Sequence, residues 1–350
     1  MSAAATLAPV PPGLSPEALP DRAAVCVRAP ARLHLGFLDP AASLGRRFGS
    51  LGLVIDGFDT VVELRPAATD QVRTETAGAA AQRGRVLEHL QRLREHTGRI
   101  APLSLHLRQV PPAHAGFGSG TQLALAVGRA FAAMHGLDLP TATLARWLGR
   151  GLRSGIGIAG FDQGGLLLDG GPGPGGAAAP LLSRLELPAQ WQVLVVLDER
   201  QQGLSGAAER EAIATLPPLP RERAAEICHE VLMRVMPGAA LGDFAAFAAG
   251  VNRVQEVLGQ HFAPAQAGGA WTSAAVGRLM QHLRDNQQVA IGQSSWGPTG
   301  FVIVPSADEA TRLIDTARQV GALDPALELR TVGARSHGAS VTPLNPAAAA

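Results

Sequence analysis

A glycine-rich loop that runs directly into a helical pattern constrains this chain most. Within residues 111–131, PPAHAGFGSGTQLALAVGRAF, the glycines Gly116, Gly118 and Gly120 surround Ser119. Glycines let backbone amides turn inward, and the positive end of a new helix favours an anion. The alternating segment LSLHLRQV predicts a strand just before the loop. The pattern predicts a phosphate site, with an ordinary strand-to-helix turn capped by Ser119 as the alternative.

The absence of lysine restricts how such a site can hold an anion. All 30 basic residues are arginine, so arginine, backbone amides or a metal must bind any phosphate or carboxylate. The net charge of +1 gives no electrostatic reason to expect nucleic acid or an anionic membrane as a partner. With 350 residues, 46% of them hydrophobic, the chain is long enough for two globular domains.

Cysteine usage and the N-terminal composition predict a cytoplasmic protein. Cys26 and Cys228 lie far apart and in no metal-binding spacing. Residues 1–22 lack a basic region followed by an apolar core, so we expect a disordered lead-in rather than a signal peptide. No apolar run approaches the roughly 20 residues that cross a bilayer.

Polar residues that suit an anion site also occur near the N-terminus. The segment AAVCVRAP predicts a strand that stops at Pro30, and RLHLGFLD then alternates, with Arg32 and His34 on its polar face. That face lies either in a site or in solvent. The glycine-flanked pair Arg46 and Arg47 either grips a phosphate or is simply solvated.

A second glycine-rich segment, residues 153–176, suits a backbone that folds closely around something. It contains Arg153, Ser154 and Asp162. Asp162 precedes an apolar strand and is a candidate base, magnesium ligand or arginine partner, with a turn-stabilising aspartate as the alternative. The sequence GPGPGGAAAP at residues 171–180 predicts a domain boundary or a mobile loop.

The remaining patterns predict an α+β protein with two domains. In the first half we expect two strands around a turn at residues 56–57 and a helix over residues 79–97. In the second half, strands alternate with helices in a split, ferredoxin-like arrangement. The predicted helices there cover residues 205–216, 220–235, 242–258 and 272–286. We predict an N-terminal domain at residues 23–185, a C-terminal domain at 186–342 and a tail at 343–350.

Three segments, in this order, resemble the three motifs of the GHMP kinase superfamily. They are APARLHLGFLD, PPAHAGFGSGTQ and IGQSSWGPTG, at residues 29–39, 111–122 and 291–300. The resemblance covers about residues 23–340. It implies a two-domain fold in which a ribosomal S5 domain 2-like N-terminal domain precedes the ferredoxin-like one.

The motifs depart from the kinase pattern in ways that disfavour ATP chemistry. His34 takes the place of an asparagine, Leu38 that of a glutamate, and Gly120 that of a second serine. By position, Asp162 matches the acid that many kinases of the superfamily use beside the substrate hydroxyl. An ATP-dependent small-molecule kinase and a non-catalytic sensor stay open as alternatives.

The closer resemblance is to the β-ribofuranosylaminobenzene 5'-phosphate synthase family. It is carried by GRRFGSLGLVID, GRGLRSGIGIAGFDQGGLLLDGG and the terminal ARSHGA. It implies a homodimeric phosphoribosyl transferase of tetrahydromethanopterin biosynthesis. Such an enzyme condenses 4-aminobenzoate with phosphoribosyl pyrophosphate and releases carbon dioxide and pyrophosphate, with a close analogue such as 4-hydroxybenzoate as the other possible acceptor.

The resemblance and this chemistry together predict which residues form the site. We expect the pyrophosphate to be held by Gly116, Gly118, Ser119, Gly120 and Thr121. The candidates for the other anions are Arg32, Arg46, Arg47, Arg153 and Ser154. The catalytic candidates are Asp162, Asp39 and His34, and the magnesium candidates are Asp162 and Ser119. No organic cofactor is expected, because the amino group of the acceptor itself supplies the electrons.

Overall fold

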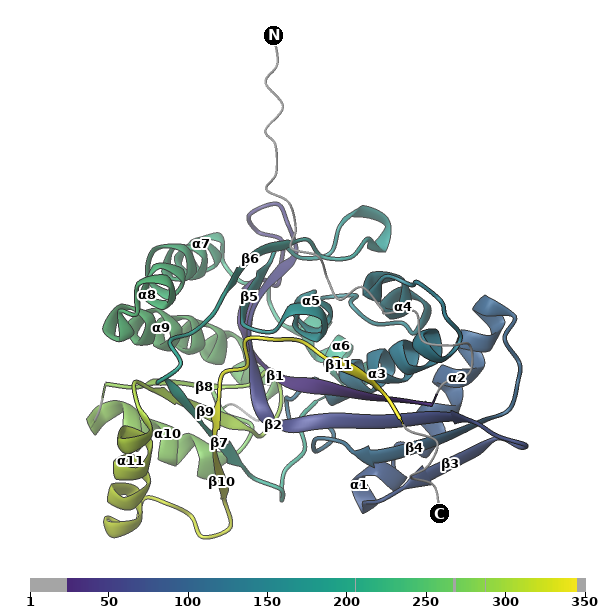
Figure 1. Ribbon diagram of the computed structural model, residues 1–350. Coiled ribbons are helices and arrows are strands. Elements are labelled where there is room, and N and C mark those ends of the chain that lie inside the picture. The colour runs from purple at the N-terminus through teal and green to yellow at the C-terminus, as the bar shows by residue number, and fades with distance from the viewer. Residues whose placement is uncertain (1–23, 205, 267–268, 287, 345–350) are drawn as a thin grey trace.

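The computed structural model describes residues 24–344 except 205, 267–268 and 287. The expected lead-in and most of the expected tail lie outside these residues. Two sheets stand side by side, and helices cover their outer faces (Figure 1). No helix in the described ranges is long and apolar enough to cross a bilayer.

Two long antiparallel strands form the centre of the first sheet. They are β1 (Val25–Asp39) and β2 (Phe48–Pro66), in the sheet order β11-β1-β2-β4-β3. A further strand, β5, pairs with β2 and with β6. The remaining bounds are β3 (Gln71–Thr74), β4 (Leu103–Gln109), β5 (Leu166–Asp169), β6 (Leu181–Leu185) and β11 (Ser340–Pro343).

Both central strands continue through positions where the sequence predicts a break. Pro30 lies within β1, where the pairing shifts between Ala29–Thr60 and Ala31–Ile55. The predicted turn at residues 56–57 lies within β2, opposite this shift. A bulge tolerates proline because the proline has no N–H to contribute to the ladder. The two predicted breaks are therefore the two sides of one bulge, and both predictions were wrong.

Helices cover one face of the first sheet. The bounds are α1 (Ala77–Ala80), α2 (Arg83–Thr97), α3 (Ser119–Met134), α4 (Thr141–Trp147) and α5 (Ile156–Gln163). The single helix expected at residues 79–97 is thus two helices. The apolar side chains of α3, among them Leu125 and Phe131, share a buried cluster with Val62 and Leu105 of the sheet. This packing places the start of α3 beside the middle of β1.

The second sheet has the strand order β10-β7-β9-β8, entirely antiparallel. Its strands are β7 (Gln192–Leu197), β8 (Ala290–Gln293), β9 (Gly300–Val304) and β10 (Glu328–Gly333). If these four strands are numbered 1 to 4 along the chain, their order across the sheet is 4-1-3-2, which is the ferredoxin-like arrangement. The fold class predicted from sequence is confirmed.

Helices also cover the second sheet. On one face, α10 (Ala274–Asn286) and α11 (Ala307–Gln319) bury Leu279, Met280 and Leu313 against the strands. Between β7 and β8 the chain forms α6 (Gly206–Thr215), α7 (Arg221–Glu230), a π-helical turn (Val231–Val235), α8 (Met236–Leu241) and α9 (Phe244–Phe262).

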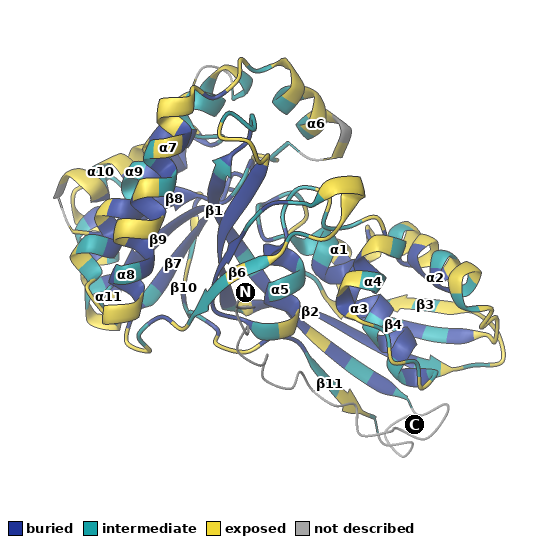
Figure 2. Ribbon diagram, turned by 90° about the horizontal axis from the view of Figure 1, so that it is seen from above, coloured by how far each residue is buried: buried dark blue, intermediate teal, exposed yellow. Residues whose placement is uncertain are grey.

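The two sheets share a core rather than standing apart. Leu33 and Leu35 of β1, Val195 of β7 and Val254 of α9 belong to one buried cluster. Figure 2 shows the inner strands largely buried, whereas the edge strands β3 and β11 and the outward helix faces are exposed. The chain passes to the second sheet after β6 and returns with β11, which pairs with β1. Residues 171–180 connect the paired strands β5 and β6, so they are a loop within one sheet and not a domain boundary.

Two glycines mark a close contact between the loop before α3 and the turn after β8. A Cβ on Gly116 would overlap the carbonyl oxygen of Ser294, and a Cβ on Gly297 would overlap the backbone of Ala115. The obstructing atoms are backbone, which cannot rotate away. Glycine is therefore required on both sides of this contact.

We expect Gly297→Ala to lower the free energy of unfolding by about 1–3 kcal/mol, because overpacking forces the backbone to shift. Gly84→Ala is the matched control, since nothing lies within 4 Å of its Cβ position in α2. That variant should be neutral or up to about 1 kcal/mol more stable. Urea unfolding of the two variants measures the difference, and equal midpoints would contradict the predicted overlap.

Candidate active site

Three segments that are distant in the chain meet around the start of α3. The Ser294 hydroxyl accepts a hydrogen bond from the His34 backbone N–H at 2.9 Å and donates one to the Gly116 carbonyl at 2.7 Å. The Arg32 backbone N–H donates to the Phe117 carbonyl at 3.2 Å. The middle of β1, the glycine loop and the turn after β8 therefore form one hydrogen-bonded unit.

The start of α3 presents backbone N–H groups that no side chain caps. Its N-cap, Gly118, has φ 67°, and no acidic residue lies in the first turn. The neighbouring helix α5 differs, because the Asp169 carboxylate accepts hydrogen bonds from the amides of Gly155 and Ile156 at 2.8 and 3.2 Å. Of these two helix starts, only that of α3 leaves its positive end free of a protein carboxylate.

Two arginine side chains with incomplete hydrogen bonding, those of Arg32 and Arg150, lie against this helix start, and Arg153 acts on the neighbouring His34. The guanidinium of Arg32 fills the space next to Gly118, where any Cβ would overlap it, and Arg150 lies 3.6 Å from the Cβ position of Gly120. Among the described residues, Arg32 Nε, Arg150 Nε and Arg153 Nη1 are buried without a hydrogen-bond partner. Each such donor costs about 1–3 kcal/mol when unsatisfied. An anion at the start of α3 would supply the missing acceptors.

Burial and charge set the protonation of the site. Burial lowers the pKa of Arg32 to about 10, and the nearby Glu209 and Asp169 oppose the shift. Burial, followed by the positive charges of Arg32 and Arg153, lowers the pKa of His34 to about 3. At neutral pH the arginine is therefore charged and the imidazole is neutral. Glu209, on α6, accepts a hydrogen bond from Arg153 at 2.7 Å.

Asp162 does not lie with the glycine loop. Its carboxylate accepts a hydrogen bond from the Thr141 hydroxyl at 2.6 Å, and this hydroxyl also accepts one from Arg129. Arg129 is ten residues beyond Ser119, about 15 Å along the axis of α3. Asp162 and Ser119, the predicted magnesium ligands, are therefore not brought together. Within the described residues, no group of three or more His, Cys, Asp or Glu side chains could hold a metal ion.

Two other predicted site residues hold backbone turns. The Asp39 carboxylate accepts hydrogen bonds from the amides of Ala41 and Leu44 at 3.1 and 2.7 Å, which orders the loop after β1. The Ser154 hydroxyl donates to Asp169 at 3.2 Å and so belongs to the cap of α5. The hydrogen bonds of both side chains therefore stabilise the nearby backbone.

The arginine pair in the loop after β1 also binds backbone. Arg46 donates to the carbonyl of Gly171 at 3.2 Å, and Arg47 donates to the carbonyl of Pro40 at 3.0 Å. The Arg47 guanidinium also lies over the ring of Phe48, 5.0 Å from its centroid. These contacts attach the loop to the segment after β5 rather than to the start of α3.

Sequence reasoning missed several residues of the site. Gly157 of α5 faces the loop, and its Cβ position lies 3.1 Å from the side chain of Thr121. Glu209 had no local sequence signal, since it lies in an ordinary amphipathic helix. Arg150 could have been found, because it stands between two glycines in the segment GRGL. Ser294 lies inside the third motif but had no assigned role.

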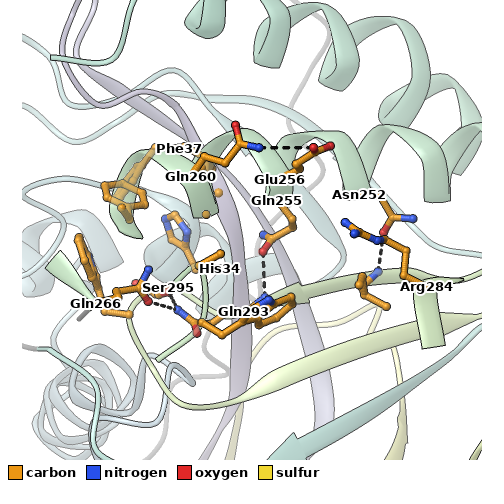
Figure 3. Close-up of a pocket in the computed structure, with 18 of the residues that line it drawn as sticks. His34, Phe37, Asn252, Gln255, Glu256, Gln260, Gln266, Arg284, Gln293 and Ser295 are labelled. Carbon is orange, nitrogen blue, oxygen red and sulfur yellow. Dashed lines mark hydrogen bonds between the residues drawn. The ribbon is translucent and has the colours of Figure 1, made fainter. Parts of the chain in front are cut away.

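A cavity of about 260 Å³ adjoins this unit, with His34 in its wall (Figure 3). Its other walls come from the neighbouring residues of β1, from α9 and the segment after it, from α10, from β8 and from the turn after β8. Phe37, Phe262, Trp271 and Trp296 contribute aromatic rings to it. The site thus combines a cationic region at the start of α3 with a ring-lined cavity that His34 borders.

The chain is similar to known proteins over most of its length. Residues 84–167 match the family described as GHMP kinases N terminal domain. The beta-ribofuranosylphenol 5'-phosphate synthase of Archaeoglobus fulgidus is 33% identical over 292 residues, which cover 80% of this chain and 88% of that protein. The protein of the same name from Methanothermobacter thermautotrophicus is 30% identical over 295 residues, covering 79% and 88%.

Solved structures share the fold at much lower identity. Homoserine kinase from Cytophaga hutchinsonii has a TM-score of 0.60 at 17% identity, covering 92% of this chain and 98% of that one. The Streptococcus pneumoniae phosphomevalonate kinase has a TM-score of 0.64 at 13% identity, covering 88% and 99%. At these identities the likeness is one of fold alone.

The buried neutral imidazole predicts a stability that falls in acid. Because the pKa of His34 drops from 6.5 to about 3, the unfolded chain binds a proton in this range that the native state does not bind. Stability contributed by this residue is therefore complete above about pH 6.5 and is lost as the pH falls, by up to about 1.4 kcal/mol per pH unit.

Urea unfolding between pH 4 and pH 7 measures this slope. We expect His34→Asn to make the pH dependence shallower, while His229→Asn, at an exposed position of α7, leaves it unchanged. His89 also has a pKa lowered to about 4 by burial, so part of the slope should persist in the His34 variant. An unaltered slope in that variant would show that His34 is protonated normally.

Proposed function

Because the chain belongs to the beta-ribofuranosylphenol 5'-phosphate synthase family, we propose that it joins 4-aminobenzoate to phosphoribosyl pyrophosphate. The protein is an enzyme that forms a C-glycoside. Carbon dioxide and pyrophosphate are the other products. The observation that carries this proposal is the uncapped start of α3, where Arg32 and Arg150 bury nitrogen atoms that have no hydrogen-bond partner among the described residues.

The reaction requires no protein nucleophile. The amino group pushes electron density to the ring carbon that bears the carboxylate, and an electron pair of that carbon forms the bond to ribose C1. The C1–oxygen bond breaks, and its pair leaves with pyrophosphate. The carbon–carboxylate bond then breaks, its pair returns to the ring, and carbon dioxide departs. Because carbon dioxide leaves in place of a proton, no base is needed at the ring.

The site matches the main charge change of this reaction. Negative charge grows on the departing pyrophosphate, and preorganised donors aimed at such charge supply much of the catalysis. We assign this role to the backbone amides at residues 118–121 together with Arg32, Arg150 and Arg153. His34 adds no positive charge near the electron-poor ribose C1, since its ring is neutral.

Magnesium enters the proposal as a companion of the substrate. Mg²⁺ is usually held through substrate phosphates with one or two protein carboxylates. Asp162 is engaged by Thr141, and no acidic residue lies in the first turn of α3, which begins with Ser119. We therefore propose that Mg²⁺ arrives as the complex with the donor pyrophosphate, and that no organic cofactor takes part.

We further propose a cytoplasmic homodimer that serves tetrahydromethanopterin synthesis. Exposed apolar side chains on α8 and on the π-helical turn before it support the dimer: Leu232, Met233 and Leu241 are 57%, 63% and 82% exposed. Large apolar side chains left exposed on one helical segment suit a contact with another protein. Sedimentation of the protein and of Met233→Glu tests this part, with a monomeric variant as the expected result.

The acceptor has a second candidate, because the relatives are named for a phenol product. A phenol product would arise from 4-hydroxybenzoate, whose hydroxyl pushes electrons as the amino group does. Assays with both acids, comparing kcat/KM, decide between them. We expect 4-aminobenzoate to have the higher value.

The central test mixes the protein with Mg²⁺, phosphoribosyl pyrophosphate and 4-aminobenzoate, and follows carbon dioxide and the arylamine product. We expect Arg32→Met to lower kcat/KM for the donor by about 100-fold, the effect of losing a charged donor to the leaving group. Asp162→Asn should stay within about threefold of the unaltered protein, because the reaction has no step that needs a base.

Other outcomes would overturn the proposal. ATP consumption with a small-molecule acceptor would identify a kinase, and donor binding without turnover would identify a sensor. A large loss of activity in Asp162→Asn, with normal folding, would return this carboxylate to the site.

A further inference from the structure

The cavity beside His34 has the volume and lining of a site for a single aromatic ring. Its volume of about 260 Å³ lies just below the range of about 300–1,000 Å³ that is typical for larger ligands. The ring centroids of Phe262 and Trp296 lie 4.6 Å apart, and those of His34 and Phe37 lie 4.5 Å apart. Such aromatic walls offer faces and edges on which another ring can stack.

The amide side chains of the cavity are already engaged with the protein. Gln255 donates to the Leu35 carbonyl at 2.6 Å and accepts from the Gln293 backbone N–H at 2.9 Å. Gln293 donates to Gln266 at 2.8 Å and accepts from the Thr272 amide at 2.6 Å. Gln293 also donates to the carbonyl of Ser295 at 3.1 Å, and Figure 3 shows the bonds that join the lining residues to one another. These bonds fix the amide side chains in place and satisfy their polar atoms.

One polar atom of the lining is not satisfied. Of the residues that line the cavity, His34 is the one whose buried side-chain nitrogen, Nε2, has no hydrogen-bond partner in the described structure. His34 is itself only 5% exposed. A buried ring nitrogen without a partner has an unmet need for a hydrogen bond, and a ligand in the cavity would meet it.

The cavity and the anion site are separated by the length of two strand residues. Arg32 and His34 follow one another on the same face of β1, about 7 Å apart at 3.3 Å per residue. Arg32 fills the space next to Gly118 at the anion site, while His34 borders the cavity. This spacing is on the scale of one ribose ring, the group that must lie between a pyrophosphate and an attacking ring carbon.

We propose that this cavity binds the aromatic acid acceptor, with the ring between the aromatic walls and the carboxylate accepting a hydrogen bond from His34 Nε2, which carries the single N–H of the neutral imidazole. The proposal rests on the function proposed above for the identity of the acid. It adds the place where the acid binds and makes His34 the group that recognises its carboxylate. The other end of the ring points toward α9 and α10, where Glu256 and Arg284 lie in the lining.

Binding of the acid can be measured without turnover. Two of the four tryptophans of the chain, Trp271 and Trp296, line the cavity, so 4-aminobenzoate should quench intrinsic tryptophan fluorescence. Aniline, which lacks the carboxylate, is the matched probe. We expect His34→Phe to weaken binding of 4-aminobenzoate about 10-fold and binding of aniline less than twofold, because only the carboxylate loses its hydrogen bond.

A second variant fills the cavity from its rim. Ala270 is exposed, lines the cavity, and has its Cβ 3.2 Å from the Cβ position of Gly259 on α9. Ala270→Phe should raise the KM for 4-aminobenzoate at least 10-fold and change the KM for phosphoribosyl pyrophosphate less than twofold. Ala326→Phe, at an exposed position before β10, is the control and should alter neither constant.

The outcomes separate this proposal from the proposed function. Turnover with an unchanged acceptor KM in Ala270→Phe would overturn the cavity assignment and leave the reaction standing. Quenching by 4-aminobenzoate that Ala270→Phe abolishes, without turnover in the unaltered protein, would support the cavity and overturn the reaction. Equal losses for the acid and for aniline in His34→Phe would overturn the role given to His34.

Discussion

The Ser294 hydroxyl holds together the part of the molecule on which the site depends. It links the His34 amide of the first sheet to the Gly116 carbonyl of the loop, and it belongs to a turn of the second sheet. The bond from His34 is buried and the bond to Gly116 is partly buried, so losing either would leave a backbone group without this partner in or near the interior. The loop can approach this closely only because Gly116 and Gly297 have no side chains. This contact thus holds the glycine loop, β1 and the turn after β8 together at the anion site.

The polar groups of the site lower the stability of the folded protein unless a ligand supplies their hydrogen-bond partners. Arg32, Arg150 and Arg153 each bury a donor without an acceptor, and His34 buries a ring nitrogen in the same condition. Glu209 compensates part of this charge through Arg153, and Asp169 adds negative potential at Arg32. Buried polar groups without hydrogen-bond partners are typical of functional sites, where a bound ligand supplies the missing partners. The same groups explain why a reaction that creates a free pyrophosphate suits this fold.

Predictions from the local sequence pattern were correct for some residues and wrong for others. The alternation in RLHLGFLD correctly paired Arg32 with His34 on one face of a strand, and the glycine run correctly placed a loop before a helix. The predicted breaks at Pro30 and at residues 56–57 were wrong because the two positions lie opposite each other in the sheet and form one bulge. Asp162 occupies the place in the chain where many kinases of the superfamily have their acid. On a helix, however, position 162 lies about 140° around the axis from position 157, the residue that faces the loop.

Secondary structure, the ferredoxin-like order of the second half and the chemistry of an arginine-only anion site followed from the amino-acid pattern, because alternation, helical period and glycine placement are local properties. The choice of which carboxylates and arginines enter the site was decided by packing. Asp39, Asp162 and Arg46 have the right chemistry, yet each is engaged by a nearby backbone or hydroxyl group. Glu209 and Ser294 enter the site from elements far away in the chain. Such contacts depend on how two sheets share one core, which no single segment encodes.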